Sequence, residues 1–156
     1  MTTASGSREV PEAPSTVWRA LAVLEPYCAV CDVSYVVEGA GQGVGTTFVC
    51  VPGRTEGRPP RAGAPRGEIV EWEPHRVVTT RLELTPEIWT TRIELSEAGA
   101  GTRVTITLTH EPRGGSRLLR RVTRGALRQM VERMVTEELA KLPAHLDQVR
   151  GGPPGE

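Results

Sequence analysis

Residues 88–111 read IWTTRIELSEAGAGTRVTITLTHE, and this stretch decides the fold. Apolar side chains fall at nearly every second position in both halves, which is the period of a β-strand with one buried face. The Gly-rich segment at residues 98–101 is long enough for a hairpin turn and too short for a parallel crossover. We therefore predict two antiparallel strands, with Val104, Ile106 and Leu108 facing the interior and the intervening threonines facing water.

Upstream of this hairpin, strand-like runs alternate with turns rich in Gly and Pro. The turns supply positive φ angles and strand breaks, so each run is predicted as one strand of a meander. The predicted strands are residues 7–12, 33–38, 46–51, 67–73 and 76–84.

Helical spacing of apolar residues appears at both ends of the chain. A helix capped by Ser15 is predicted to end before Pro26, with a second short turn of helix at residues 27–31. A long helix capped by Ser116 carries a broad apolar stripe out to about Leu142, where Pro143 ends or kinks it.

Segregated strands and helices define an α+β fold, with about seven antiparallel strands and one long C-terminal helix. We expect a single domain over residues 1–150 and a disordered tail at residues 151–156. A long helix over a curved sheet cannot touch it everywhere. A cavity between the two is therefore the default ligand site.

The composition narrows the class of function. Among 156 residues, 19 basic side chains balance 19 acidic ones, which argues against a nucleic-acid-binding protein. No apolar run approaches the ~18 residues of a membrane span, and the N-terminus lacks the apolar core of a signal peptide. We therefore expect a cytoplasmic protein.

Four segments carry a family resemblance: residues 10–18 (VPEAPSTVW), 43–48 (GVGTTF), 66–74 (RGEIVEWEP) and 101–108 (GTRVTITL). In this order they resemble the START-like (SRPBCC) superfamily, the polyketide cyclase/dehydrase and lipid-transport group, over residues 7–145. The resemblance implies a helix-grip fold, in which the sheet wraps around the C-terminal helix and two short helices follow the first strand. It also implies a hydrophobic tunnel. Because members include aromatase/cyclases, hormone receptors, lipid carriers and co-chaperones, the resemblance specifies a pocket and not a reaction.

The strand and helix phases predict which side chains line that pocket. The predicted ligand-binding wall is Phe48, Cys50, Val70, Trp72, Leu82, Trp89, Ile93, Ile106, Leu108, Met130 and Met134. Trp72 and Trp89 offer stacking surfaces for a planar ligand. The alternative is that these side chains are simply core.

Three polar residues share faces with this wall and are candidates for proton transfer: His110, Tyr35 and Glu68. His110 ends the strand that carries Ile106 and Leu108, and a histidine there can move a proton near neutral pH. Each also has a structural alternative, as a strand-end or rim residue.

The cysteines form one close pair, Cys28-Ala-Val-Cys31, which is compatible with a redox pair or with half of a metal site. Zinc would need two more ligands, from Cys50 and one of His75, His110 or His145, but none has diagnostic spacing. The sequence therefore favours free thiols and predicts no metal and no cofactor.

The long helix carries a concentration of positive charge. Residues 113–133 contain seven arginines and one acid, and five of the arginines crowd the first half of the helix, where the macrodipole disfavours cations. We interpret Arg117, Arg120, Arg121, Arg124 and Arg128 as a surface for an anionic partner. Candidates are an acidic carrier protein, a phosphate-bearing ligand or an anionic membrane. The alternative is a solvated face paired with Glu68, Glu71, Glu73 and the other carboxylates of the sheet.

Taken together, these features predict a protein that binds a hydrophobic small molecule. Whether it is an enzyme stays open. A cyclase/aromatase of polyketide type is favoured if the gene lies in a biosynthetic cluster. The alternatives are a non-catalytic carrier and a co-chaperone-like interaction module that uses the Arg-rich helix.

Overall fold

The hairpin predicted from residues 88–111 forms the longest strand pair of the sheet. In the computed structural model, which describes residues 1–39 and 41–151, β6 (Glu87–Ala98) and β7 (Gly101–Pro112) pair antiparallel along their whole length. Ile93 lies opposite Ile106, and Trp89 lies opposite His110. Residues 152–156 of the predicted tail lie outside the described residues.

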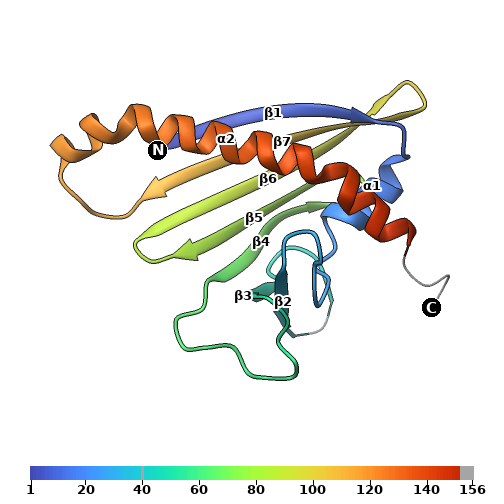
Figure 1. Ribbon diagram of the computed structural model, residues 1–156, viewed down its shortest axis with the longest axis horizontal. Coiled ribbons are helices and arrows are strands. Elements are labelled where there is room, and N and C mark those ends of the chain that lie inside the picture. The colour runs from blue at the N-terminus through green and yellow to red at the C-terminus, as the bar shows by residue number, and fades with distance from the viewer. Residues whose placement is uncertain (40, 152–156) are drawn as a thin grey trace.

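Around this hairpin the sheet has seven strands in the order β1-β7-β6-β5-β4-β3-β2, and every neighbouring pair is antiparallel. The chain therefore meanders from β2 to β7 and its first strand closes onto its last (Figure 1). The other elements are β1 (Thr2–Val10), α1 (Pro14–Leu21), β2 (Val33–Glu38), β3 (Thr47–Pro52), β4 (Arg66–Glu73), β5 (Val77–Leu84) and α2 (Arg117–Arg150). The predicted curved antiparallel sheet with a long C-terminal helix is confirmed.

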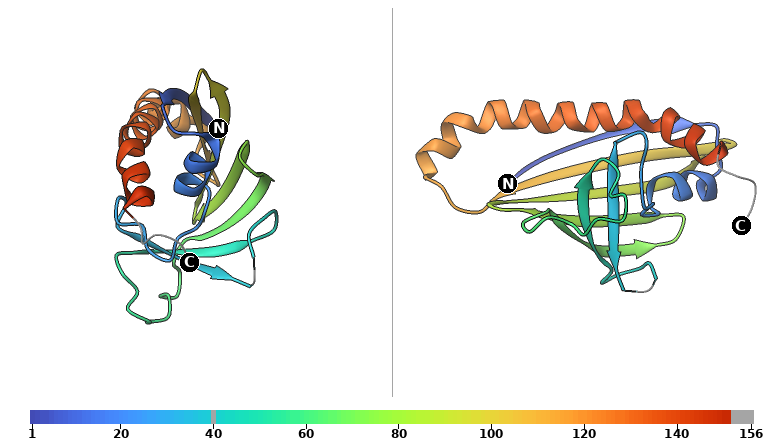
Figure 2. Two further views of the ribbon diagram at one scale, coloured as in Figure 1. Left: turned by 90° about the vertical axis from the view of Figure 1, so that its right-hand side faces the viewer. Right: turned by 60° about the horizontal axis from the view of Figure 1, so that its bottom comes forward.

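The helix α2 lies over one side of the sheet only. It packs on β1, β7 and α1, while β2 and β3 turn away from its middle (Figure 1, Figure 2). Val131, Val135, Leu142 and Leu146 are its buried side chains. A Cβ added at Gly6 of β1 would lie 2.9 Å from Leu139 and 3.0 Å from Val135, so the helix approaches β1 as closely as a glycine permits.

Pro143 does not end α2, so of the two predicted outcomes, a helix that ends there or kinks there, the first is wrong. A proline lacks the N–H that would bond the carbonyl four residues earlier, which here belongs to Leu139. The Arg8 guanidinium donates to that carbonyl at 3.1 Å. The strand thus supplies the hydrogen bond that the proline cannot, and the helix continues to Arg150.

The second short helix is not formed. Residues 28–33 make a turn closed by two backbone hydrogen bonds between Cys28 and Val33, and Asp32 adopts φ = 51°. One short helix, α1, therefore follows the first strand.

A β-bulge in β4 overturns two predicted positions. Ile69 pairs with Thr80, but the next paired residue is Glu71, opposite Thr79, so Val70 is an extra residue. A bulge shifts the alternation of faces. Gly67, Ile69 and Trp72 consequently face α2, whereas Glu68 is exposed and Val70 is 42% exposed. The prediction that Glu68 and Val70 share the inner face with Trp72 is wrong.

The first third of α2 runs beyond the strand ends (Figure 2). Within residues 117–130 only Leu127 is partly buried, and Leu118, Leu119, Val122 and Met130 are 73%, 62%, 78% and 41% exposed. The apolar stripe predicted for this helix therefore reaches the core only from Leu127 onward, and Met130 is not part of a pocket wall. No helix in the described part of the chain is both long and apolar enough to cross a membrane.

Gly67 leaves room for the tip of the Phe48 ring against β4, so we expect Gly67→Ala to destabilise the fold. The added Cβ would overlap the Phe48 ring, which is 3% exposed and enclosed by the core. Such overpacking costs about 1–3 kcal/mol of the free energy of unfolding. Urea denaturation monitored by circular dichroism measures the change.

Gly125→Ala is the matched control. Gly125 lies on the exposed part of α2 with no atom within 4 Å of an added Cβ, so the same change should stabilise by about 0.5–1 kcal/mol. Equal effects of the two substitutions would contradict the close contact at Gly67.

Candidate functional site

The inner face of the sheet, which is the face toward α2, carries a row of apolar side chains that are only partly buried. These residues border the two hydrophobic clusters of the core without being enclosed by them, because α2 lies over β1 and β7. They are Tyr35, Val37, Cys50, Trp72, Leu82, Trp89 and Ile93, with Met134 and Leu139 contributed by α2. Most of the predicted wall therefore lies on one surface.

Three predicted wall residues belong to the core instead. Phe48, Ile106 and Leu108 are 3%, 5% and 7% exposed, so they are enclosed in the core on the same face of the sheet. Trp18 on α1 packs edge-on against Trp72, with ring centroids 4.9 Å apart.

Tyr35 and Cys50 form one end of the inner face. They lie directly opposite each other on β2 and β3, and Tyr35 meets Phe48 edge-on at 5.9 Å. Burial raises the pKa of Tyr35 well above its ordinary value and raises the pKa of Cys50 to about 11. Both groups are therefore uncharged at neutral pH.

His110 and Trp89 form the other end. The His110 side chain is 4% exposed, and its ring lies 4.6 Å from the Trp89 ring at a tilt of 57°. Glu87 Oε2 accepts a hydrogen bond from Trp89 Nε1 at 3.1 Å and lies 3.3 Å from His110 Nε2. That second contact is poorly aligned, and within the described residues neither His110 nitrogen has a hydrogen-bond partner. A buried polar group without a partner is uncommon, and it marks the place where a ligand atom could bond.

The three predicted proton-transfer residues are not brought together. Tyr35 is on β2 and His110 is on β7, with four strands between them in the sheet. At about 4.8 Å per strand this is about 24 Å along the sheet. Glu68 lies on the opposite face. No acid–base pair can form among the three.

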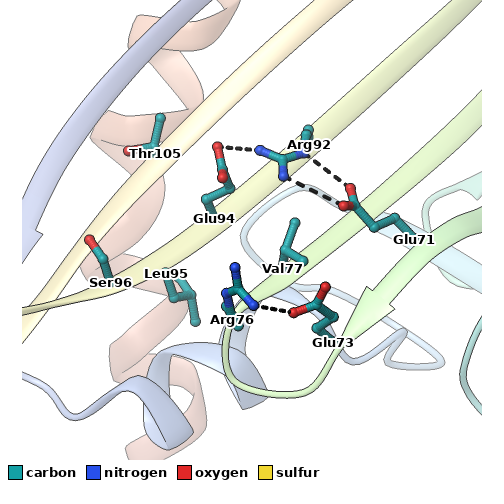
Figure 3. Close-up of a pocket in the computed structure, with 9 residues that line it drawn as sticks. All are labelled: Glu71, Glu73, Arg76, Val77, Arg92, Glu94, Leu95, Ser96 and Thr105. Carbon is teal, nitrogen blue, oxygen red and sulfur yellow. Dashed lines mark hydrogen bonds and ion pairs between the residues drawn. The ribbon is translucent and has the colours of Figure 1, made fainter.

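Two hollows of about 340 Å³ each mark the surface, and neither is lined by a residue of α2. The first lies mainly on the outer face, where Glu71, Arg92 and Glu94 form a ladder of ion pairs next to the Arg76–Glu73 pair (Figure 3). Hydrogen bonds from Thr79 and Arg92 hold the pKa of Glu71 below its usual range. The second is lined by Ser7, Arg8, Glu9 and Arg103. Both hollows are lined mainly by charged side chains that form salt bridges, so neither is the predicted apolar cavity.

The arginines of the exposed helix segment are not neutralised by the sheet. Glu71 and Glu73 pair with Arg92 and Arg76, so the predicted alternative fails for both acids. Arg128 pairs with Glu132 on its own helix, and Arg120 donates to the carbonyls of Gly114 and Gly115. Residues 117–128 therefore carry unbalanced positive charge.

The cysteine pair meets a histidine. Cys28 and Cys31 are free thiols, and their sulfurs lie 3.8 Å and 3.7 Å from Nδ1 and Nε2 of His145. Burial raises the pKa of Cys31 to about 11 and lowers that of His145. His145 was one of three histidines that the sequence offered, and its separation of 114 residues from Cys31 gave no signal.

Comparison with solved structures shows the same architecture in proteins of low sequence identity. Ara h 8.0201 is 13% identical, with 96% of this chain and 98% of that chain covered and a TM-score of 0.62. TTHA0849 from Thermus thermophilus is 20% identical (94% and 95% covered, TM-score 0.59). MLL2253 from Mesorhizobium loti is 17% identical (94% and 97% covered, TM-score 0.58). At these identities the likeness is one of fold.

No curated protein matches the sequence. A family model described as "Polyketide cyclase / dehydrase and lipid transport" matches residues 1–147, nearly the whole chain. The resemblance to the START-like superfamily is thereby confirmed, and the chain belongs to the polyketide cyclase/dehydrase and lipid-transport family.

Proposed function

We propose that this protein binds a hydrophobic, ring-bearing small molecule on the inner face of the sheet, beside α2. One observation carries the proposal. Helix α2 packs on β1, β7 and α1, and the aromatic and aliphatic side chains on the inner face of β2 to β6 are left half-buried. A ligand that covers this surface removes apolar area from water, which contributes about 25 cal/mol of favourable free energy for each Å² buried.

The arrangement of polar groups favours binding over general acid–base catalysis. Tyr35 and His110 stand at opposite ends of the inner face, so each can hold a polar atom of a long ligand, but they cannot share one proton transfer. In a cyclase-type reaction the surface would act mainly by folding the substrate. His110, beside Glu87, would then be the one group placed to move a proton.

A binding assay with two probes tests this role of His110. An anthraquinone probe should quench the fluorescence of Trp72 and Trp89 saturably, and palmitate should compete with it. His110→Phe keeps the packing on Trp89 but removes both ring nitrogens, so it should weaken the keto-bearing anthraquinone about tenfold, the value of one hydrogen bond, and leave palmitate unchanged.

Glu68→Gln, on the outer face, is the control and should bind both probes like the wild type. Equal losses in the two variants, or absence of saturable quenching, would contradict the proposed site.

The thiol of Cys50 reports on the same surface through its pH dependence. Because its pKa is about 11, the reactive thiolate is scarce at pH 8. Alkylation by iodoacetamide should therefore speed up about tenfold per pH unit and level off only near pH 11. Peptide mass spectrometry gives the rate at Cys50, and bound anthraquinone should slow it. A plateau near pH 9 would show that Cys50 is not buried in the inner face.

A second function, docking of an acidic carrier protein, is favoured by the exposed segment of α2. Leu118, Leu119 and Val122 are exposed among Arg117, Arg120, Arg121, Arg124 and Arg128. Apolar contact ringed by cations suits an acidic partner surface with an apolar centre.

Charge reversal tests this docking. The triple variant Arg120→Glu/Arg121→Glu/Arg124→Glu should abolish binding of an acyl carrier protein in surface plasmon resonance, while anthraquinone binding persists. The control is Arg61→Glu/Arg66→Glu, on the loop before β4 and at its start. Unchanged carrier binding by the triple variant, or equal loss in the control, would remove this function.

A further inference from the structure

The cluster of Cys28, Cys31 and His145 joins two segments that are distant in the sequence. The cysteines lie in the turn between α1 and β2, and His145 lies near the end of α2. Their donor atoms, one from each residue, all lie within 4.8 Å of one another. Cys28 is buried, whereas Cys31 and His145 are partly exposed, so an ion can reach the cluster from solvent.

Local contacts hold the cysteine turn in shape. Cys28 and Val33 exchange backbone hydrogen bonds, and the Asp32 carbonyl accepts from Gly53 N at 2.7 Å. The Asp32 carboxylate accepts from Tyr27 Oη at 2.7 Å, and the Arg54 guanidinium lies 4.1 Å from the Tyr27 ring centre. The two sulfurs are therefore directed at His145 by a turn that is already fixed.

Each sulfur lies near the separation from a ring nitrogen that a tetrahedral thiolate–imidazole site requires. Zn–S bonds of about 2.3 Å and Zn–N bonds of about 2.0–2.1 Å place sulfur and nitrogen about 3.6 Å apart in a tetrahedron. The observed separations are 3.8 Å and 3.7 Å. The two separations are to different ring nitrogens, and an ion binds only one of them, so the imidazole must turn for a single nitrogen to serve both sulfurs. One donor atom from each of the three residues already lies within 4.8 Å of the others.

Hydrogen bonding between the thiols and the imidazole does not by itself account for this cluster. Thiols are weak hydrogen-bond donors, so two S···N contacts give little stability in themselves. Cys50, the third thiol, lies on β3 opposite Tyr35 and outside the cluster. Two sulfurs and an imidazole form the donor set that selects Zn²⁺ over Mg²⁺ or Ca²⁺.

We propose that Cys28, Cys31 and His145 form a zinc site that ties the turn before β2 to the C-terminal part of α2. Binding converts both thiols to thiolates and releases their two protons to solvent. Three protein ligands leave a fourth position for water or for a carboxylate. Glu138, seven residues before His145 on the same face of α2 and paired with Lys141 at 3.0 Å, is one candidate on that helix.

The site would close the Tyr35 end of the inner face. Tyr35 follows the turn directly, and its backbone N–H donates to the Pro26 carbonyl at 3.3 Å. An ion bound to the turn and to α2 thus fixes the separation between β2 and the helix, which sets the width of the inner face at that end. The inference does not depend on which ligand the inner face binds.

Cobalt titration of the reduced, metal-free protein tests the site directly. Co²⁺ should bind with one equivalent, giving a thiolate-to-cobalt charge-transfer band and the intense visible bands of a tetrahedral ion, and Zn²⁺ should displace it. Cys31→Ser and His145→Gln should each weaken binding at least about 100-fold, whereas Cys50→Ser should leave it unchanged. Equal spectra in all variants, or loss in Cys50→Ser alone, would overturn the assignment.

Alkylation of the wild-type protein keeps the test valid should a variant not fold. One equivalent of Zn²⁺ should slow iodoacetamide modification of Cys28 and Cys31 at least tenfold and leave Cys50 unaffected, as read by peptide mass spectrometry. Zinc should also raise the melting temperature. Uniform protection of all three cysteines, or protection of none, would overturn the proposal, and neither result bears on anthraquinone binding.

Discussion

The contact between α2 and β1 at Gly6 constrains the rest of the structure. With no side chain there, Val135 and Leu139 approach the strand, and Arg8 bonds the carbonyl that Pro143 leaves free. The helix is thereby fixed along β1 and β7, at one edge of a sheet of seven strands. The helix packs along β1 and β7 and reaches the turn before β2 only near its C-terminal end, at His145, so the apolar side chains on the strands between are only partly buried.

The open surface has two chemically different ends because the sheet separates them. Tyr35 and Cys50 lie beside the turn that carries Cys28 and Cys31, whereas His110 lies beneath Trp89 and beside Glu87. At the first end, burial keeps the Cys50 thiol and the Tyr35 phenol uncharged by raising their pKa values. The second has an imidazole without a hydrogen bond among the described residues. A ligand that spans both ends would be oriented by its polar groups, while the aromatic wall between them supplies the affinity.

Sequence periodicity was sufficient for the strands from β2 to β7 and for the fold class, because alternation of apolar residues is a local property that the sheet preserves. The first strand was misplaced: it runs from Thr2 to Val10 and not over residues 7–12. Periodicity failed at the β-bulge in β4. The extra residue Val70 puts Glu68 on the opposite face from the predicted one, and nothing in the surrounding residues distinguishes a bulge from a regular strand. The apolar stripe of α2 was correct as a helix pattern. Which part of the stripe is buried depends on how far the strands extend beneath the helix, and the pattern of residues along a helix gives no information about that length. His145 was found only through the tertiary fold, since the sheet brings it to a cysteine pair 114 residues away.

The exposed segment of α2 opposes several local preferences at once. Its arginines stand near the positive end of the helix dipole, and its apolar residues face water. In its favour, Ser116 caps the helix by accepting from Leu118 N at 3.2 Å. Without packing, a segment of this length is marginally helical by itself. It extends from a part of α2 that the core holds firmly, so helical order propagates outward from Val131 with no new nucleation. The segment is therefore the element whose stability would gain most from an anionic partner, because such a partner covers the apolar side chains and neutralises the arginines in one step.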